Sequence, residues 1–234
     1  MIKLTANFNN ILLPILKRYL GQYSEPNIHE YFFEILDETK NVFQKRYNDR
    51  NGQKWRNESG KMLELLVVYF IGGAVSEMGY DITTDDQIKR AKSGILEKVA
   101  HNIVLKYGEY YVMPDGDIVV YCPQNGDVKA ILSCKASLRE RFAQTLYWKL
   151  KLSLNERTSK IKMYFITVDK EWNKEKTKFK KPSLDIRKGQ DPTKPRILLE
   201  HEMDGVYVMR GMGHETEKVK MFDKFIDDLK ELLK

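Results

Sequence analysis

Apolar residues recur at helical spacing over the first part of the chain. Isoleucine, leucine or tyrosine occupies positions 11, 12, 15, 16, 19 and 20, and a similar period runs from residue 27 to residue 43. Side chains three and four positions apart line one face of a helix. Pro14 either kinks the first helix or marks its first turn. The pattern predicts an added N-terminal helical lobe over residues 1–56, followed by one larger domain over residues 57–234.

A nearly all-round apolar helix is predicted over residues 60–73, and Glu64 is its single carboxylate. Burying an unpaired carboxylate costs several kcal/mol, so Glu64 must be exposed or directed at a cation. Because apolar residues flank Glu64 on both sides, we favour a place in or next to a metal site.

Two short apolar runs, 118–121 and 130–132, flank the sequence Pro-Gln-Asn-Gly at 123–126. Asn-Gly tolerates the positive φ angles of a hairpin turn, so the two runs are predicted to pair as antiparallel strands. Asp117 opens the first strand and Lys135 closes the second, which brings a carboxylate and an ammonium to one edge of a buried sheet. Such a pair suits a metal-dependent phosphodiesterase, because the acid holds a hard cation and the amine polarises water or phosphate.

The hairpin register decides whether Asp117 and Lys135 share a face. A two-residue turn at Asn125-Gly126 would place residue 117 opposite residue 134, on the wrong face for Ser133 and Lys135. We therefore predict an odd-length connection, such as a loop with a bulge at the glycine, which places residue 117 opposite 133 or 135. The literal Asp-x-Lys at 127–129 lies too far along the strand, at roughly 3.3 Å per residue, to share a metal with Asp117.

The rest of the chain adds elements around this hairpin. We predict a strand within 99–112 before the hairpin, and after it a capping box at Ser137–Glu140 that starts a helix. A strand over 161–168 should follow through a crossover, and then a long irregular basic loop over 170–196. The chain is predicted to end with short strands at 197–199 and 206–209 and with an amphipathic helix from residue 219.

Composition narrows the class of protein. The 234 residues are 42% hydrophobic, enough for a substantial core, and the net charge of +7 favours a polyanionic partner. The two cysteines, Cys122 and Cys134, lie in predicted strands and are expected to be buried thiols of a reducing compartment. The first residues lack the pattern of a signal peptide, and no apolar run reaches the roughly 20 residues of a membrane span. We expect a soluble, cytoplasmic protein that has no membrane partner.

Two polar, basic segments are candidates for contacts with nucleic acid, since arginine, lysine, asparagine and glutamine bond phosphates and base edges. The alternative for each is a solvated loop. The candidate DNA-binding residues are Arg50, Asn51, Gln53, Lys54 and Arg56 in the first segment, Lys178, Lys180, Lys181, Arg187 and Lys188 in the second, and Arg139 after the hairpin.

These residues together resemble the PD-(D/E)xK nuclease superfamily, in particular type II restriction endonucleases. The matching pieces are Glu64 in Gly-Lys-x-Leu-Glu, the sequence Pro-Asp-Gly-Asp at 114–117, and Lys135 in the run Lys-Ala-Ser-Leu-Arg-Glu-Arg at 135–141. The resemblance spans roughly residues 58–150. It implies an α/β, restriction-endonuclease-like core of a helix, a three-stranded antiparallel meander, a helix and a strand.

One position departs from the family pattern. The family has Asp or Glu two residues before the lysine, where this chain has Ser133. Glu140 or Gln144 of the following helix could replace the missing acid, or Asp115 could contribute alongside Asp117. We rank Asp117 and Lys135 first as catalytic residues, then Glu64, then Ser133, with Asp117 and Glu64 as the metal ligands.

The resemblance implies a sequence-specific endonuclease that hydrolyses double-stranded DNA with Mg²⁺ and leaves 5′-phosphate and 3′-hydroxyl ends. Cutting both strands of a palindromic site calls for a homodimer. Two other interpretations stay open: a structure- or damage-directed repair nuclease of the same fold, and a non-catalytic basic nucleic-acid-binding protein in which Asp117, Lys135 and Glu64 form an ion network.

Overall fold

The structure is a computed structural model that describes residues 5–23, 25–136, 138, 141–169, 184, 191–211 and 213–234. Its helices are α1 (Leu13–Gln22), α2 (Phe32–Arg46), α3 (Gln53–Glu77), α4 (Asp85–Arg90), α5 (Ile95–Ile103), α6 (Arg141–Ser153), α7 (Lys194–Glu202) and α8 (Phe225–Leu233). Its strands are β1 (Asp81–Thr84), β2 (Leu105–Tyr107), β3 (Tyr110–Val112), β4 (Ile118–Tyr121), β5 (Val128–Lys135), β6 (Lys162–Thr167), β7 (Gly205–Val208) and β8 (Val219–Met221).

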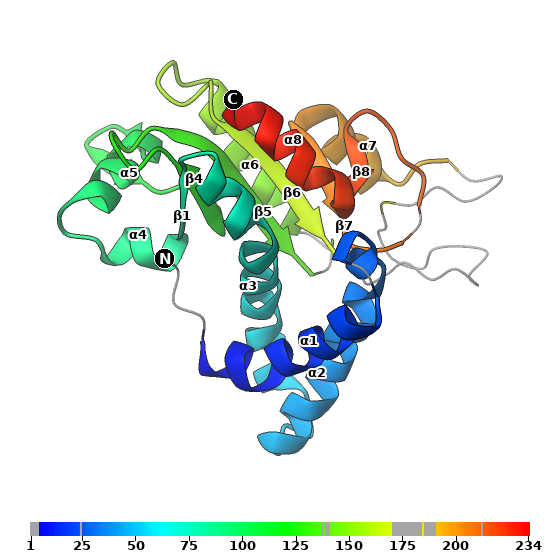
Figure 1. The fold of residues 1–234 in the computed structure, drawn as a ribbon. Coiled ribbons are helices and arrows are strands. Elements are labelled where there is room, and N and C mark those ends of the chain that lie inside the picture. The colour runs from blue at the N-terminus through cyan, green and yellow to red at the C-terminus, as the bar shows by residue number, and fades with distance from the viewer. Residues whose placement is uncertain are drawn as a thin grey trace.

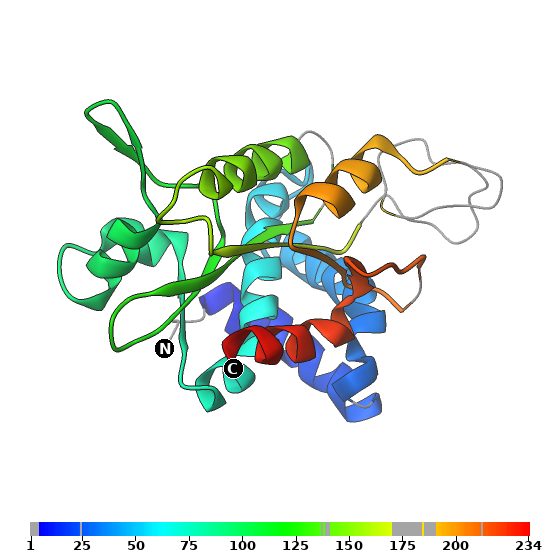
Figure 2. The ribbon, with the colours of Figure 1, turned by 90° about the horizontal axis from the view of Figure 1, so that it is seen from above.

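A six-stranded mixed sheet forms the middle of the molecule. Its strand order is β1-β4-β5-β6-β7-β8, and β2 and β3 form a separate two-stranded sheet. Strands β1, β4 and β5 pair antiparallel, whereas β5, β6, β7 and β8 pair parallel. Figure 2 shows α6 and α7 on one face of the sheet and α3, α8 and the N-terminal helices on the other. The α/β class predicted from the sequence is therefore correct.

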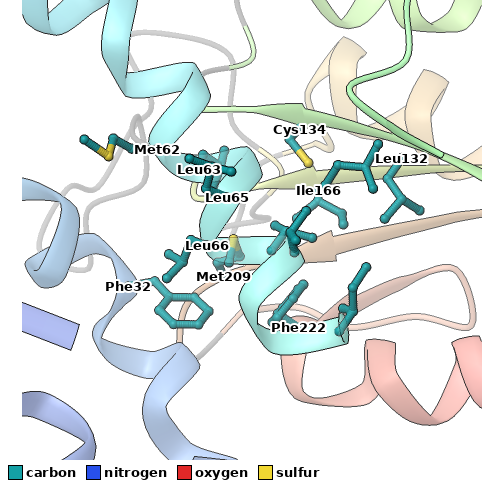
Figure 3. Packing of buried hydrophobic residues seen from close by; sticks show 14 of the residues in the cluster. Phe32, Met62, Leu63, Leu65, Leu66, Leu132, Cys134, Ile166, Met209 and Phe222 are labelled. Atoms are coloured by element: carbon teal, nitrogen blue, oxygen red, sulfur yellow. The ribbon is translucent and has the colours of Figure 1, made fainter. Parts of the chain in front are cut away.

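Helix α3 is the central helix of one of these two layers (Figure 1). Its buried residues Met62, Leu63, Leu65 and Leu66 belong to the same hydrophobic cluster as strand residues such as Leu132 (Figure 3). Side chains of α1 and α2 belong to this cluster as well. By length and composition alone α3 could also cross a membrane, but here it serves as a core helix against the sheet. Its position carries Glu64 towards the end of the central strands.

Two predicted elements are wrong. The first strand of the antiparallel part is β1, not a strand within 99–112, where the structure has α5 and the β2–β3 hairpin. Residues 197–199 lie in α7, because Thr193 caps the helix start by accepting a hydrogen bond from the Arg196 amide and Pro195 occupies its first turn. A short apolar run does not by itself distinguish a strand from a helix.

Other predicted elements agree with the structure. Strand β6 lies parallel to β5 and is reached through α6, as a crossover requires. Pro14 lies in the first turn of α1. The C-terminal helix is α8, although residues 219–221 before it form strand β8. The predicted capping box and most of the basic loop lie outside the described residues.

Candidate active site

Asp117 and Lys135 meet at the end of the central antiparallel pair. The Lys135 Nζ atom lies 2.8 Å from Asp117 Oδ2, and their side chains are 7% and 16% exposed. Asp117 directly precedes β4, and Lys135 is the last residue of β5. The sequence predicted this juxtaposition, and the structure brings the two groups together on one face, within reach of solvent.

The pairing register explains the meeting. Ile118 pairs with Leu132, so residue 117 lies opposite residue 133, the register that an odd connection produces. The chain achieves it with a register shift between Val120 and Tyr121, not with a bulge at the glycine. Gly126 has φ of +82° and closes the turn by donating its amide to the Cys122 carbonyl. The predicted register is thus correct, and the predicted place of the irregularity is wrong.

The two carboxylate oxygens of Asp117 differ in their surroundings. Oδ2 accepts hydrogen bonds from Lys135 Nζ and from the Cys134 amide, at 2.8 and 2.6 Å. Oδ1 accepts no hydrogen bond from the described part of the chain. Burial alone lowers the pKa of Lys135, but the charge and hydrogen bond of Asp117 outweigh it and hold that pKa above its usual value. The site therefore contains a protonated amine beside a carboxylate with one oxygen left for a cation.

Glu64 extends towards this pair from α3. Burial is the largest influence on Glu64 and raises its pKa, and the nearby charge of Asp117 raises it further. Lys61 opposes the shift by donating a hydrogen bond of 2.8 Å to Glu64 Oε2. The carboxylate is 16% exposed. Carboxyl groups whose pKa values are shifted by burial and by a second acid are found preferentially at functional sites.

Gly116 allows the backbone before β4 to approach strand β5 closely. A Cβ atom built on Gly116 would lie 2.2 Å from Cγ2 of Ile131 in β5, inside any normal contact distance. The glycine in the sequence Pro-Asp-Gly-Asp therefore allows residues 115–117 to pack against β5. No residue other than glycine fits here unless the Ile131 side chain or the backbone moves.

The structure places the other candidate residues differently. Ser133 is fully buried, and its Oγ atom lies 3.0 Å from the Thr145 hydroxyl of α6. Gln144 is exposed on α6, and Asp115 is close enough for its charge to raise the pKa of Lys135. Glu140 lies outside the described residues. No group of three or more His, Cys, Asp or Glu side chains in the described ranges could share a metal ion.

Part of the first basic segment borders a cleft of about 500 Å³ between α2, the start of α3 and the end of β6. Arg50, Asn51 and Arg56 line it, together with Lys40 and with Val168, which follows β6. The end of β6 adjoins the end of β5, since Thr167 pairs with Lys135. The cleft therefore opens near the candidate catalytic edge.

The remaining DNA-binding candidates in the described part of the chain do not line that cleft. Gln53 and Lys54 are exposed at the start of α3, where Lys54 Nζ donates a hydrogen bond to the Tyr47 carbonyl. The predicted contacts at Arg139, Lys178, Lys180, Lys181, Arg187 and Lys188 lie outside the described residues.

Sequence reasoning missed Lys61 and Asp86. Lys61 Nζ lies 2.8 Å from Glu64 and 3.9 Å from Asp86, so it links α3 to the start of α4. The Asp85 amide in turn lies 3.5 Å from the Asp117 carbonyl. The three-residue spacing of Lys61 and Glu64 was visible in the sequence, whereas the approach of α4 was not, because it depends on pairing between β1 and β4.

An acid–amine pair at the end of a sheet, with a second carboxylate on an adjacent helix, is an arrangement suited to a phosphodiesterase. Residues 86–228 match the family model described as "BsaWI restriction endonuclease type 2". The chain therefore belongs to the BsaWI family of type II restriction endonucleases, whose members are DNA endonucleases.

Curated relatives agree with this family. The chain is 33% identical over 228 residues to "Putative type II restriction enzyme MjaVIP" of Methanocaldococcus jannaschii, covering 96% of this chain and 94% of that protein. It is 47% identical over 90 residues to "Probable type II restriction enzyme HpyAORF263P" of Helicobacter pylori, covering 37% of this chain and 46% of that protein. A solved structure of restriction endonuclease BsaWI bound to DNA aligns with a TM-score of 0.48 at 10% identity, covering 98% of this chain and 93% of that chain.

Proposed function

We propose that this chain is a sequence-specific endonuclease of the PD-(D/E)xK type that cleaves double-stranded DNA in the cytoplasm. It would act with Mg²⁺ and leave 5′-phosphate and 3′-hydroxyl ends. The observation that carries the proposal is the partly buried contact of 2.8 Å between Lys135 Nζ and Asp117 Oδ2 beside Glu64. Membership in a restriction endonuclease family supports DNA as the substrate.

The donor set fits a hard divalent cation. Asp117 Oδ1 and Glu64 Oε1 accept no hydrogen bond in the described part of the chain, so each carboxylate keeps one oxygen for a ligand. Mg²⁺ usually takes one or two protein carboxylates and completes its shell with water and substrate phosphate. Such an ion would neutralise charge on the phosphate and on the leaving oxygen.

Each side chain then has a separate part. Asp117 and Glu64 would hold the cation, and Lys135, kept protonated by Asp117, would orient the attacking water and stabilise charge on the phosphate. The residues of the cleft, Arg50, Asn51 and Arg56, would contact the DNA backbone or base edges. Because both strands of a two-fold site must be cut, we propose that two copies act together.

The decisive experiment is digestion of a sequenced plasmid with Mg²⁺ by three proteins: wild type, Lys135→Ala and Lys129→Ala. Lys129 is a matched control, because it lies in the same strand as Lys135 but near the turn. The wild type and Lys129→Ala should give the same discrete fragments, and Lys135→Ala should cut at least roughly 10²-fold more slowly with DNA affinity retained. Religation of the fragments without prior phosphorylation would confirm 5′-phosphate and 3′-hydroxyl ends.

Unchanged cleavage by Lys135→Ala would remove this lysine from the mechanism. Smears or structure-dependent nicks in place of discrete fragments would favour the repair nuclease, and binding with no cleavage would favour the non-catalytic protein.

A further inference from the structure

Exposed hydrophobic side chains gather on one side of the molecule, on the β2–β3 hairpin and along α6. Of the twelve large hydrophobic residues exposed in the described ranges, seven lie within 105–112 and 141–154. The hairpin–helix surface, as we call it, comprises Tyr107, Tyr110, Val112, Tyr147, Leu150 and Leu154. Soluble monomers usually scatter such residues singly, so a concentration of this kind marks an interaction site.

The surface is continuous across the two elements. The hydroxyl oxygens of Tyr107 and Tyr147 lie 3.1 Å apart, and Lys151 Nζ lies 5.9 and 5.5 Å from the centres of these two rings. Tyr110 pairs directly with Tyr107 across the hairpin and so shares its face. Along α6, Tyr147, Leu150 and Leu154 follow one another at three- and four-residue spacing, which places them on one stripe.

The strand edges of the hairpin are unpaired in the described part of the chain. In the described part of the chain its two strands pair only with each other, and Leu105 is their only buried residue. The hairpin projects from the body of the molecule beside α6 (Figure 2). Unpaired strand edges are templates for pairing with another chain.

The chemistry of the surface favours a second copy of this chain over DNA. The aliphatic side chains of Leu150 and Leu154, 52% and 73% exposed, offer nothing to a phosphate backbone. Exposed Glu109 at the hairpin tip would be repelled by phosphates, yet its charge complements that of Lys151, which lies over the Tyr107 and Tyr147 rings. A two-fold interface must be self-complementary, and tyrosine is enriched at the centre of such contacts.

We infer that the hairpin–helix surface is the two-fold interface between two copies of this chain. The inference deepens the proposed function, from which it takes the requirement for two active sites, but its test does not depend on catalysis. The surface belongs to the two elements that flank the catalytic pair in sequence: the hairpin precedes Asp117, and α6 follows Lys135. Pairing through it would therefore link the two sites through short, direct connections.

The test measures molar mass by analytical ultracentrifugation over a range of protein concentrations, without DNA or metal. The variants are Leu150→Glu/Leu154→Glu on α6 and Tyr110→Glu on the hairpin. Ile197→Glu is the control, because Ile197 is 44% exposed on α7 and is not among the residues of the hairpin–helix surface. Wild type and control should dimerise alike, and both surface variants should dissociate with a dimer Kd at least about tenfold higher, since burying like charges opposes association.

Circular dichroism establishes whether each variant is folded. If the α6 variant unfolds, Tyr110→Glu still tests the inference, because residue 110 lies on a projecting hairpin where a substitution should not disturb folding. A wild type that stays monomeric, or folded surface variants that dimerise like the control, would overturn the inference. So would variants that keep the wild-type mass but lose DNA affinity, because the surface would then contact DNA. If masses change as expected but no protein cuts DNA, the interface stands and the proposed function fails.

Discussion

Glu64 is a carboxylate whose ionisation the fold disfavours. It lies in an otherwise apolar helix, and burial together with the charge of Asp117 raises its pKa although Lys61 donates a hydrogen bond to it. An acid whose pKa is raised by folding contributes stability that is complete below its unfolded pKa and is lost as the pH rises through its folded pKa. A bound cation would compensate this cost by favouring the ionised form.

We therefore expect Glu64→Gln to raise the melting temperature without metal by a margin that is negligible near about pH 4 and larger near about pH 8. The same variant should cleave DNA roughly 10²- to 10³-fold more slowly, because a ligand oxygen is lost. Thermal unfolding at several pH values and plasmid digestion measure the two effects. Glu77→Gln, at the exposed end of the same helix, is the control. A melting-temperature change that did not vary with pH would contradict the account.

At the scale of elements, prediction from the sequence succeeded where the interactions are local. Asp117 and Lys135 are joined by one hairpin whose turn residues and alternation are visible in the sequence, so their meeting could be derived. The pairing of β1 with β4 could not, because the sequence Asp-Ile-Thr-Thr of β1 has little apolar signal. The cleft escaped prediction for the same reason, since it joins Arg50 and Arg56 to Val168, more than a hundred residues away.

The contact between β5 and α6 allows the role of Ser133, which stands where the family has an acid, to be tested. Ser133 and Thr145 lie with their hydroxyls 3.0 Å apart in a buried contact. Ser133→Ala and Thr145→Val should each lower the free energy of unfolding by about 1 kcal/mol, and the double variant should lose less than the sum, because each removes the same hydrogen bond. Denaturant unfolding measures the cycle. If Ser133 only joins the two elements, cleavage by Ser133→Ala stays near the wild-type rate, whereas a large loss of cleavage would make Ser133 catalytic.

On the scale of the whole molecule, charge and shape favour approach of DNA from one side. The net charge is +7, and the cleft that Arg50, Arg56 and Lys40 line lies near the catalytic edge. The hairpin–helix surface, which carries aliphatic residues and charges of both signs, is a separate region on β2, β3 and α6. With one face for DNA and another for the second copy, a dimer could hold DNA while the two partners contact different residues.

This division predicts different salt dependences for two exposed cations. Arg50→Ala should weaken DNA binding and reduce the slope of log K against log salt by about 0.9, because one phosphate contact and its released counterion are lost. Lys160→Ala should leave the slope unchanged, since Lys160 precedes β6 at the opposite end of the sheet from Lys135. Binding is measured by fluorescence anisotropy at several salt concentrations without Mg²⁺, so that cleavage does not intervene. Equal slopes for Arg50→Ala and wild type would exclude a phosphate contact by Arg50, whereas a reduced slope for Lys160→Ala would extend the DNA footprint across the molecule.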